Sequence, residues 1–244
     1  MALNMTLNTL WETSLLSDDP WWLYLVYGAG WTVSLALSAF MLALAIGTIV
    51  GTLRTVENKW VRGICEGWIE LFRNIPLIVQ IFIWYFVVPE IIPAYKDWMI
   101  ETDPVYSQFL SAFLCMGLFT SSRIAEQVRA GITSIPQGLP NAVKALGFTT
   151  IERYRYIVLP MAFRLVMPPL TSEAMNLVKN TAVAMTIGLP ELTMRANEMG
   201  EATFQFFAAY LWATILYIAI ALCVNRLMAW MEVRCTIPGF IAAK

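Results

Sequence analysis

The chain has 244 residues, of which 59% are hydrophobic and 14% are charged, and its formal net charge is −1. Soluble domains are typically about 45–50% apolar and about 25% charged, so this composition excludes an ordinary soluble protein and indicates a polytopic membrane protein. No basic, aromatic-rich soluble patch suggests nucleic-acid binding.

The first predicted membrane span comes from residues 20–53, which carry no charge. This stretch exceeds the roughly 20 residues that cross about 30 Å of hydrocarbon. No lysine or arginine precedes Arg54, so the N-terminal segment, residues 1–27, lacks a cytoplasmic anchor. We therefore expect that segment on the outer side of the membrane.

Four further spans are predicted along the chain, at residues 70–89, 105–122, 157–189 and 202–225. As one helix, the third of these four would measure about 50 Å at 1.5 Å per residue. Because Pro168 and Pro169 remove helical hydrogen bonds, we predict a break there. The sequence therefore predicts an all-α membrane protein with about five transmembrane helices.

The basic residues indicate the orientation of these spans, since cytoplasmic loops carry an excess of lysine and arginine. With the N-terminus outside, the inner side receives Arg54, Lys59, Arg62, Arg129, Lys144, Arg153, Arg155, Arg226, Arg234 and Lys244, and the outer side receives Lys96 and Arg195. The outer loops are predicted to present an acidic face made of Glu90, Asp97, Glu101, Asp103, Glu191, Glu198 and Glu201.

Several chemistries are excluded by what the sequence lacks. It has no histidine, so histidine triads and histidine metal sites are excluded, and we expect no metal site. Its four cysteines are scattered and are predicted to be reduced packing residues. No phosphate-binding loop motif is present, and a further nucleotide-binding domain of about 100–200 residues would not fit beside the membrane helices. We therefore expect that this chain is not an enzyme and binds no cofactor, and that another subunit binds ATP.

Two short motifs carry a family resemblance. Residues 70–80, ELFRNIPLIVQ, resemble a signature of the permease subunits of bacterial polar amino-acid ABC importers, and residues 125–132, AEQVRAGI, resemble the stretch that precedes their coupling loop. The acidic and basic residues of the first motif are spaced i,i+3 and can pair, and its proline suits a helix start. The residues expected to shape the fold are Glu70, Arg73, Pro76, Glu126 and Arg129.

A polar segment at residues 136–155 interrupts the apolar sequence, and a charged helix there must lie at the membrane surface. After Gly147, the chain ends this region with Ile157, Leu159 and Pro160, which resembles the G-x9-I-x-L-P ending of the EAA coupling loop of ABC importers. Two positions depart from that motif, Asn141 and Val143. The resemblance implies coupling to an ATPase through Asn141, Ala142, Ala145, Gly147, Leu159 and Pro160, with Ala142, Ala145 and Leu146 forming an apolar side.

Residues 177–184, LVKNTAVA, resemble a further motif of the same permeases. Together the matches cover residues 28–232, which we expect to form the transmembrane domain of a type I, MetI-like ABC importer permease, followed by a cytoplasmic tail at 233–244. The resemblance and the polar side chains near the proline pair suggest a translocation pathway that includes Gln80, Arg123, Ser172, Asn176, Lys179 and Asn180.

Arg123 is the most informative of these residues. A charge at the inner end of a membrane span costs several kcal/mol by most estimates unless it is paired or hydrated. Its guanidinium can therefore bind a substrate, form an ion pair with Glu126 one helical turn later, or extend to the lipid headgroups at the inner surface of the membrane. The sequence alone leaves these interpretations open.

The combination FRNIPLIVQ, LFTSSRIAEQVRAGI and MPPLTSEAMNLVKNTAVA most resembles permeases of Gram-negative glutamate/aspartate importers. That implies acidic amino-acid uptake across the cell inner membrane, with the N-terminus periplasmic and the C-terminus cytoplasmic. It also implies cytoplasmic ATP-binding subunits, a periplasmic solute-binding protein, and a second related permease or a copy of this chain. A permease for glutamine or another polar amino acid is the nearest alternative. A passive channel, or a membrane-embedded enzyme with Glu173 and Lys179 as an acid–base pair, would belong to other classes.

Overall fold

The computed structural model of the protein describes residues 10–12, 14, 19–136 and 138–235. These residues form helices joined by short turns, which confirms the predicted all-α fold class. Parts of the predicted N-terminal segment and of the cytoplasmic tail, residues 1–9, 13, 15–18 and 236–244, lie outside the described residues.

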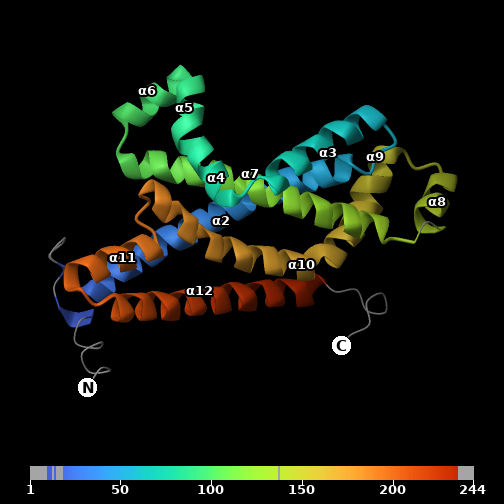
Figure 1. Cartoon of the computed structure of the whole chain (residues 1–244). Coiled ribbons are helices and arrows are strands. Elements are labelled where there is room, and N and C mark those ends of the chain that lie inside the picture. The colour runs from blue at the N-terminus through green and yellow to red at the C-terminus, as the bar shows by residue number, and fades with distance from the viewer. Residues whose placement is uncertain (1–9, 13, 15–18, 137, 236–244) are drawn as a thin grey trace. The chain divides into compact units, whose positions relative to one another are not determined.

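Four long helices organise the described chain, as Figure 1 shows: α2 (Trp21–Leu53), α7 (Pro104–Thr133), α10 (Leu159–Asn180) and α12 (Phe206–Cys235). Between α2 and α7 lie α3 (Lys59–Asn74), α4 (Leu77–Phe82), the π-helical turn η1 (Ile83–Val87), α5 (Val88–Ile91) and α6 (Pro93–Glu101). Between α7 and α10 lie α8 (Gly138–Ala145), α9 (Thr150–Arg153) and the π-helical turn η2 (Tyr154–Val158). The 3-10 helix η3 (Thr181–Ile187) and α11 (Leu192–Thr203) precede α12.

The predicted spans correspond to five helical stretches. Among the described residues, α2 and the segment Phe206–Arg234 are long and apolar enough to cross a membrane. Helix α3 and the segment Leu77–Ile91 form a pair bent by 99°, which counts as a third crossing if the pair is one span. Helices α7 and α10 are also long, but both carry charged side chains, so length and composition alone do not assign them as spans.

The bend between α3 and α4 falls at Ile75 and Pro76, which both have extended backbone angles. A proline disfavours helical angles in the residue before it, and this explains why α3 ends at Asn74. Helix α4 begins directly after Pro76, which confirms the predicted helix start.

The predicted break at Pro168 and Pro169 is wrong, because α10 runs through both residues. A proline ring fixes φ near −65°, which is a helical value, so each proline removes a hydrogen bond without imposing a different φ. The neighbouring side chains Val166, Met167 and Leu170 are buried, and their packing holds the helix together. The helix ends instead where η3 begins.

The described chain divides into two compact units, and each of the four long helices contributes to both. The first unit comprises Met1–Phe40, Pro76–Gly117 and Asn176–Cys223, and the second comprises Met41–Ile75, Leu118–Met175 and Val224–Lys244. The core of the first unit has two apolar clusters, one around Leu35, Ile81 and Met116 and the other around Trp21 and Leu192.

Glu191 does not belong to an acidic outer face, because the first unit buries it completely. Its carboxylate caps α11 by accepting a hydrogen bond from the Met194 backbone N–H at 2.9 Å, and it accepts another from the Tyr217 hydroxyl at 2.7 Å. Glu198 is also engaged, since it pairs with Arg195 at 3.0 Å. Glu191 is therefore a core residue and not part of the predicted acidic outer face.

In the second unit, α2 approaches α7 closely at Gly47 and Gly51. A Cβ on Gly47 would lie 2.8 Å from Ile124 Cβ, and a Cβ on Gly51 would lie 2.5 Å from the Ala125 carbonyl oxygen. Small residues spaced four apart let membrane helices pack backbone against side chain. This pair therefore sets the contact between α2 and α7.

We expect Gly51→Ala to destabilise the protein by about 1–3 kcal/mol, because the added methyl group overlaps α7. Gly30→Ala is the matched control in the same helix, where a Cβ would have no atom within 4 Å. It should be neutral or gain up to about 1 kcal/mol from helix propensity. Thermal unfolding of the detergent-solubilised protein measures both effects, and equal Tm values for the two variants would contradict the close packing.

Candidate functional site

A polar cavity of about 410 Å³ lies in the second unit. Six side chains from α3, α7 and α10 line it: Arg73, Phe119, Arg123, Glu126, Gln127 and Glu173. The four from α7 recur at three- and four-residue spacings, which places them on one face of that helix. The volume falls within the range of about 300–1,000 Å³ that is usual for small-molecule sites.

Arg123 forms an ion pair with Glu173 of α10, with 3.1 Å between Nε and Oε2. Gln127 Nε2 donates a hydrogen bond to the same carboxylate at 3.1 Å. The Glu173 side chain is 8% exposed and the Arg123 side chain is 41% exposed. A buried carboxylate needs a partner, because an unpaired one is costly. The pair therefore stabilises Glu173 and leaves part of the guanidinium accessible.

The alternative pairing of Arg123 with Glu126 is not formed. Glu126 accepts a hydrogen bond from Arg129 Nη2 at 2.7 Å and also pairs with Arg54, the residue that follows α2. Arg129 lies three residues after Glu126, at a favourable helix spacing, and Arg54 reaches Glu126 from the turn after α2. With Glu126 already neutralised by two guanidinium groups, Arg123 pairs across to α10.

Glu70 and Arg73 do not form the predicted ion pair in the described structure, and both residues are exposed. An exposed i,i+3 pair contributes little free energy, so its spacing does not enforce contact. Arg73 instead lines the polar cavity, where it adds a second guanidinium to that of Arg123.

Of the predicted pathway residues, only Arg123 lines this cavity. Ser172 precedes Glu173 on α10, but it is exposed and does not line the cavity. The other four lie in the first unit: Gln80, Asn176, Lys179 and Asn180. Lys179 is exposed and forms no ion pair among the described residues, so the acid–base pair that an enzyme would need is not present.

Sequence reasoning missed Phe119 and Gln127 as lining residues. Their signal was the four-residue spacing on either side of Arg123, which puts all three on one helix face. The sequence suggested Glu173 only as half of an acid–base pair with Lys179, and not as the partner of Arg123. Its contact with Arg123 joins residues 50 positions apart, and such a contact depends on how two helices pack.

The segment predicted as the coupling loop contains two short helices, α8 and α9, joined by a turn at Gly147, whose φ is 88°. Val143 of α8 is buried, which gives this departure from the EAA motif a packing role. Ala142 and Ala145 are exposed, and Leu146 and Ile151 are 76% and 78% exposed. The side chain of Asn141 lies outside the described residues. The apolar side chains of Leu146 and Ile151 are therefore on the surface of this unit.

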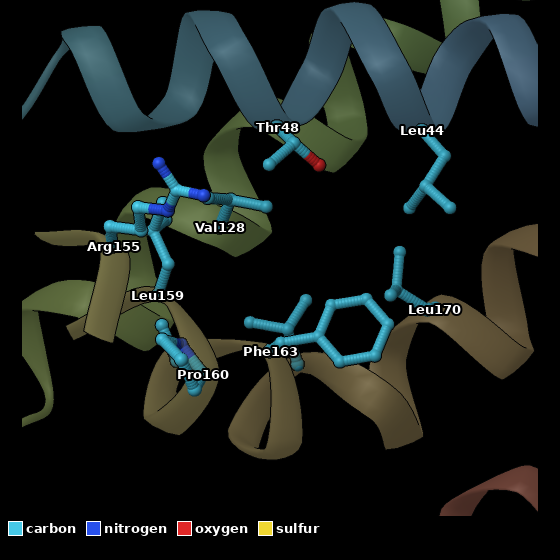
Figure 2. A pocket seen from close by; sticks show the side chains of 10 residues that line it. Leu44, Thr48, Val128, Arg155, Leu159, Pro160, Phe163 and Leu170 are labelled. Carbon is cyan, nitrogen blue, oxygen red and sulfur yellow. The ribbon is translucent and has the colours of Figure 1, made fainter. Parts of the chain in front are cut away.

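Leu159 and Pro160 begin α10 and line a second, apolar cavity in the same unit, of about 300 Å³. Figure 2 shows them beside Arg155 and below Thr48 of α2. These two residues of the loop motif are thus also packing residues in the first turn of a long helix.

Helix α9 begins with a reciprocal pair of hydrogen bonds between Thr149 and Glu152. The Thr149 hydroxyl and backbone N–H donate to the Glu152 carboxylate at 2.7 and 2.9 Å, and they hold the pKa of Glu152 below its ordinary value. A carboxyl group with a lowered pKa stabilises the fold above its unfolded pKa of about 4.3, and this contribution is lost as the pH falls through the folded pKa.

We therefore expect backbone amides at the start of α9 to exchange hydrogen several-fold faster below about pH 4 than at pH 7, after correction for intrinsic rates. In the Thr149→Ala variant, exchange should be fast at both pH values, because the cap is absent throughout. Hydrogen–deuterium exchange by mass spectrometry measures this, and a pH response that survives in Thr149→Ala would contradict the role of the cap.

Comparison with known proteins identifies relatives along most of the chain. Residues 43–236 match the family described as binding-protein-dependent transport system inner membrane component. The chain is 42% identical over 215 residues to the glutamate/aspartate import permease of Escherichia coli K12, covering 87% of both chains. It is 29% identical to the glutamine transport permease of the same strain, covering 86% of this chain and 92% of that one.

Solved structures share the fold. A crystal structure of an amino acid ABC transporter with histidines superposes with a TM-score of 0.72 at 23% identity, covering 86% of this chain and 94% of that chain. An inward-facing methionine ABC transporter superposes with a TM-score of 0.73 at 20% identity, covering 88% and 97%. The all-helical fold, the family match and the permease relatives agree, and the chain belongs to the family of inner-membrane components of binding-protein-dependent transport systems.

Proposed function

We propose that this chain is the permease subunit of an ATP-driven importer for acidic amino acids, and that it forms part of the path of glutamate and aspartate. The observation that carries the substrate class is the 42% identity to the Escherichia coli glutamate/aspartate permease. Glutamine permeases of Escherichia coli and Bacillus subtilis are 29% identical or less. As a member of this family, the chain is a transport component and not an enzyme.

The polar cavity supplies chemistry that suits such a substrate. Glutamate and aspartate carry two carboxylates and one ammonium group, and guanidinium groups bind carboxylates through paired hydrogen bonds. Arg73 and Arg123 line the cavity, and the Arg123 guanidinium is partly accessible beside Glu173. Gln127 Oε1 is buried and accepts no hydrogen bond within the described structure, so it can accept one from an ammonium group. Glutamine, with an uncharged side chain, would bring only one carboxylate to these two guanidinium groups, whereas glutamate brings two.

The remaining pathway residues stay part of the proposal: Gln80, Ser172, Asn176, Lys179 and Asn180. Asn176 and Asn180 are four residues apart on α10, and Ser172 precedes Asn176 by the same interval, so the three lie on one face of the helix. That face offers successive polar groups to a solute moving along α10.

The proposed partners are cytoplasmic ATP-binding subunits, a periplasmic solute-binding protein and a second permease, either related or a copy. The positive-inside rule supports a periplasmic N-terminus and a cytoplasmic location of the C-terminus and the coupling loop. The exposed Leu146 and Ile151 would contact the ATPase. ATP can drive transport only if the ATPase binds one permease conformation more tightly than the other.

Uptake of radiolabelled glutamate into proteoliposomes tests the proposal. The vesicles would contain the complete transporter and internal ATP, with a solute-binding protein outside and unlabelled aspartate, glutamine and arginine as competitors. ATP-dependent uptake that only aspartate blocks would support the proposal. Block by glutamine or arginine would contradict the substrate class, and uptake without ATP would contradict active import.

A further inference from the structure

The apolar cavity of the second unit contains one charged side chain. Its lining comes from α2, α7, η2 and α10 and is apolar except for Thr48 and Arg155. Figure 2 shows Arg155 at one end and Leu44 and Leu170 at the other, with Phe163 facing α2. The cavity therefore has a cationic end and an apolar end, which suits an amphipathic anion.

The charge at its mouth is not neutralised by the protein. Arg155 is exposed and takes part in no ion pair in the part of the chain that the structure describes. Its guanidinium lies 5.6 Å from the ring of Tyr156, which is itself exposed. An arginine beside an exposed tyrosine is typical of the level of lipid headgroups. The polar segment that precedes it must also lie at the membrane surface.

The surroundings of the cavity are those of a lipid-facing surface. Phe163 of the lining is partly exposed, and Ile49, the residue after Thr48 on α2, is exposed and apolar. Lipid tails are as apolar as these side chains, so moving an acyl chain from the bilayer into the cavity changes the free energy little. Any selectivity must then come from the charge of Arg155. One arginine near the surface favours an anionic headgroup by about 1 kcal/mol, which is about fivefold in affinity.

We propose that this cavity binds one anionic phospholipid of the surrounding membrane, with an acyl chain along α10 and the phosphate on Arg155. The site is separate from the polar cavity that would hold the transported solute, and the two share no lining residue. Its occupancy therefore does not depend on which amino acid is transported.

Native mass spectrometry of the complete purified transporter, titrated with phosphatidylglycerol or phosphatidylethanolamine, tests the headgroup contact. Phosphatidylglycerol should bind about fivefold more tightly than phosphatidylethanolamine. Arg155→Gln should remove this preference, and Arg155→Lys should retain most of it. Arg153→Gln is the matched control, because Arg153 lies two residues away and lines a different cavity. The affinity of the Arg153→Gln variant for phosphatidylglycerol should stay unchanged.

A second pair of variants tests the acyl chain. Thr48→Phe places a ring inside the cavity and should abolish retention of both lipids, whereas Ile49→Phe adds a ring to the exposed neighbouring position and should leave retention unchanged. Equal losses for Arg155→Gln and Arg153→Gln, or full retention in Thr48→Phe, would overturn the proposal. So would a wild-type complex that retains no lipid, which would mean that another subunit covers the cavity.

Discussion

Replacing Arg123 with glutamine is expected to lower ATP-driven glutamate uptake by about ten- to a hundredfold, because charged hydrogen bonds contribute about 1.5–3 kcal/mol. The substitution removes the guanidinium that we propose binds the substrate carboxylate. It also leaves Glu173, whose side chain is 8% exposed, without its ion-pair partner at 3.1 Å. An uncompensated carboxylate in this cavity would repel an anionic substrate. Initial rates in proteoliposomes measure the effect.

The double variant Arg123→Gln, Glu173→Gln separates a structural role from a substrate role. Both variants change the same ion pair, so their effects on stability should be strongly non-additive, and the double variant should unfold near the wild-type temperature. If Arg123 contacts substrate, uptake stays low in the double variant although stability returns. Recovery of uptake together with stability would show that Arg123 acts only as the partner of Glu173.

Replacing Gly147 with valine is expected to separate ATP hydrolysis from transport. Gly147 has φ 88°, and a Cβ there would have no atom within 4 Å, so the effect is conformational and not a clash. Placing a residue with a side chain in the left-handed region costs about 1–2 kcal/mol of conformational free energy, and a β-branched residue costs more. The turn between α8 and α9 should therefore open, and uptake should fall at least about tenfold while membrane insertion persists.

Gly147→Asn is the control for this substitution, because asparagine adopts the left-handed region more readily than other residues with side chains. It should retain most of the coupled uptake. The measurement is the ratio of ATP hydrolysed to glutamate imported in the same vesicles. A wild-type ratio in Gly147→Val would contradict a coupling role for this turn.

The membrane elements were largely predictable from local sequence. Residues 20–53 carry no charge, and α2 occupies Trp21–Leu53, because a long uncharged segment satisfies its backbone polar groups as a helix. Pro76 predicted the start of α4 for a similarly local reason, since the fixed φ of proline and its missing N–H are tolerated at the start of a helix. Membership of the family was also predictable from the sequence, because each family motif is a short run of neighbouring residues.

The tertiary structure decided which charged groups meet. Helix spacing allowed Arg123 to pair with Glu126, but Arg54 and Arg129 already neutralise that carboxylate, and Arg123 pairs with Glu173 of another helix. The sequence likewise placed Glu191 on an outer surface, whereas the first unit buries it as a helix cap. Periodicity and proline chemistry act over a few residues and can be read along the chain. The partner of a buried charge depends on which helices pack together, and only the folded chain specifies that.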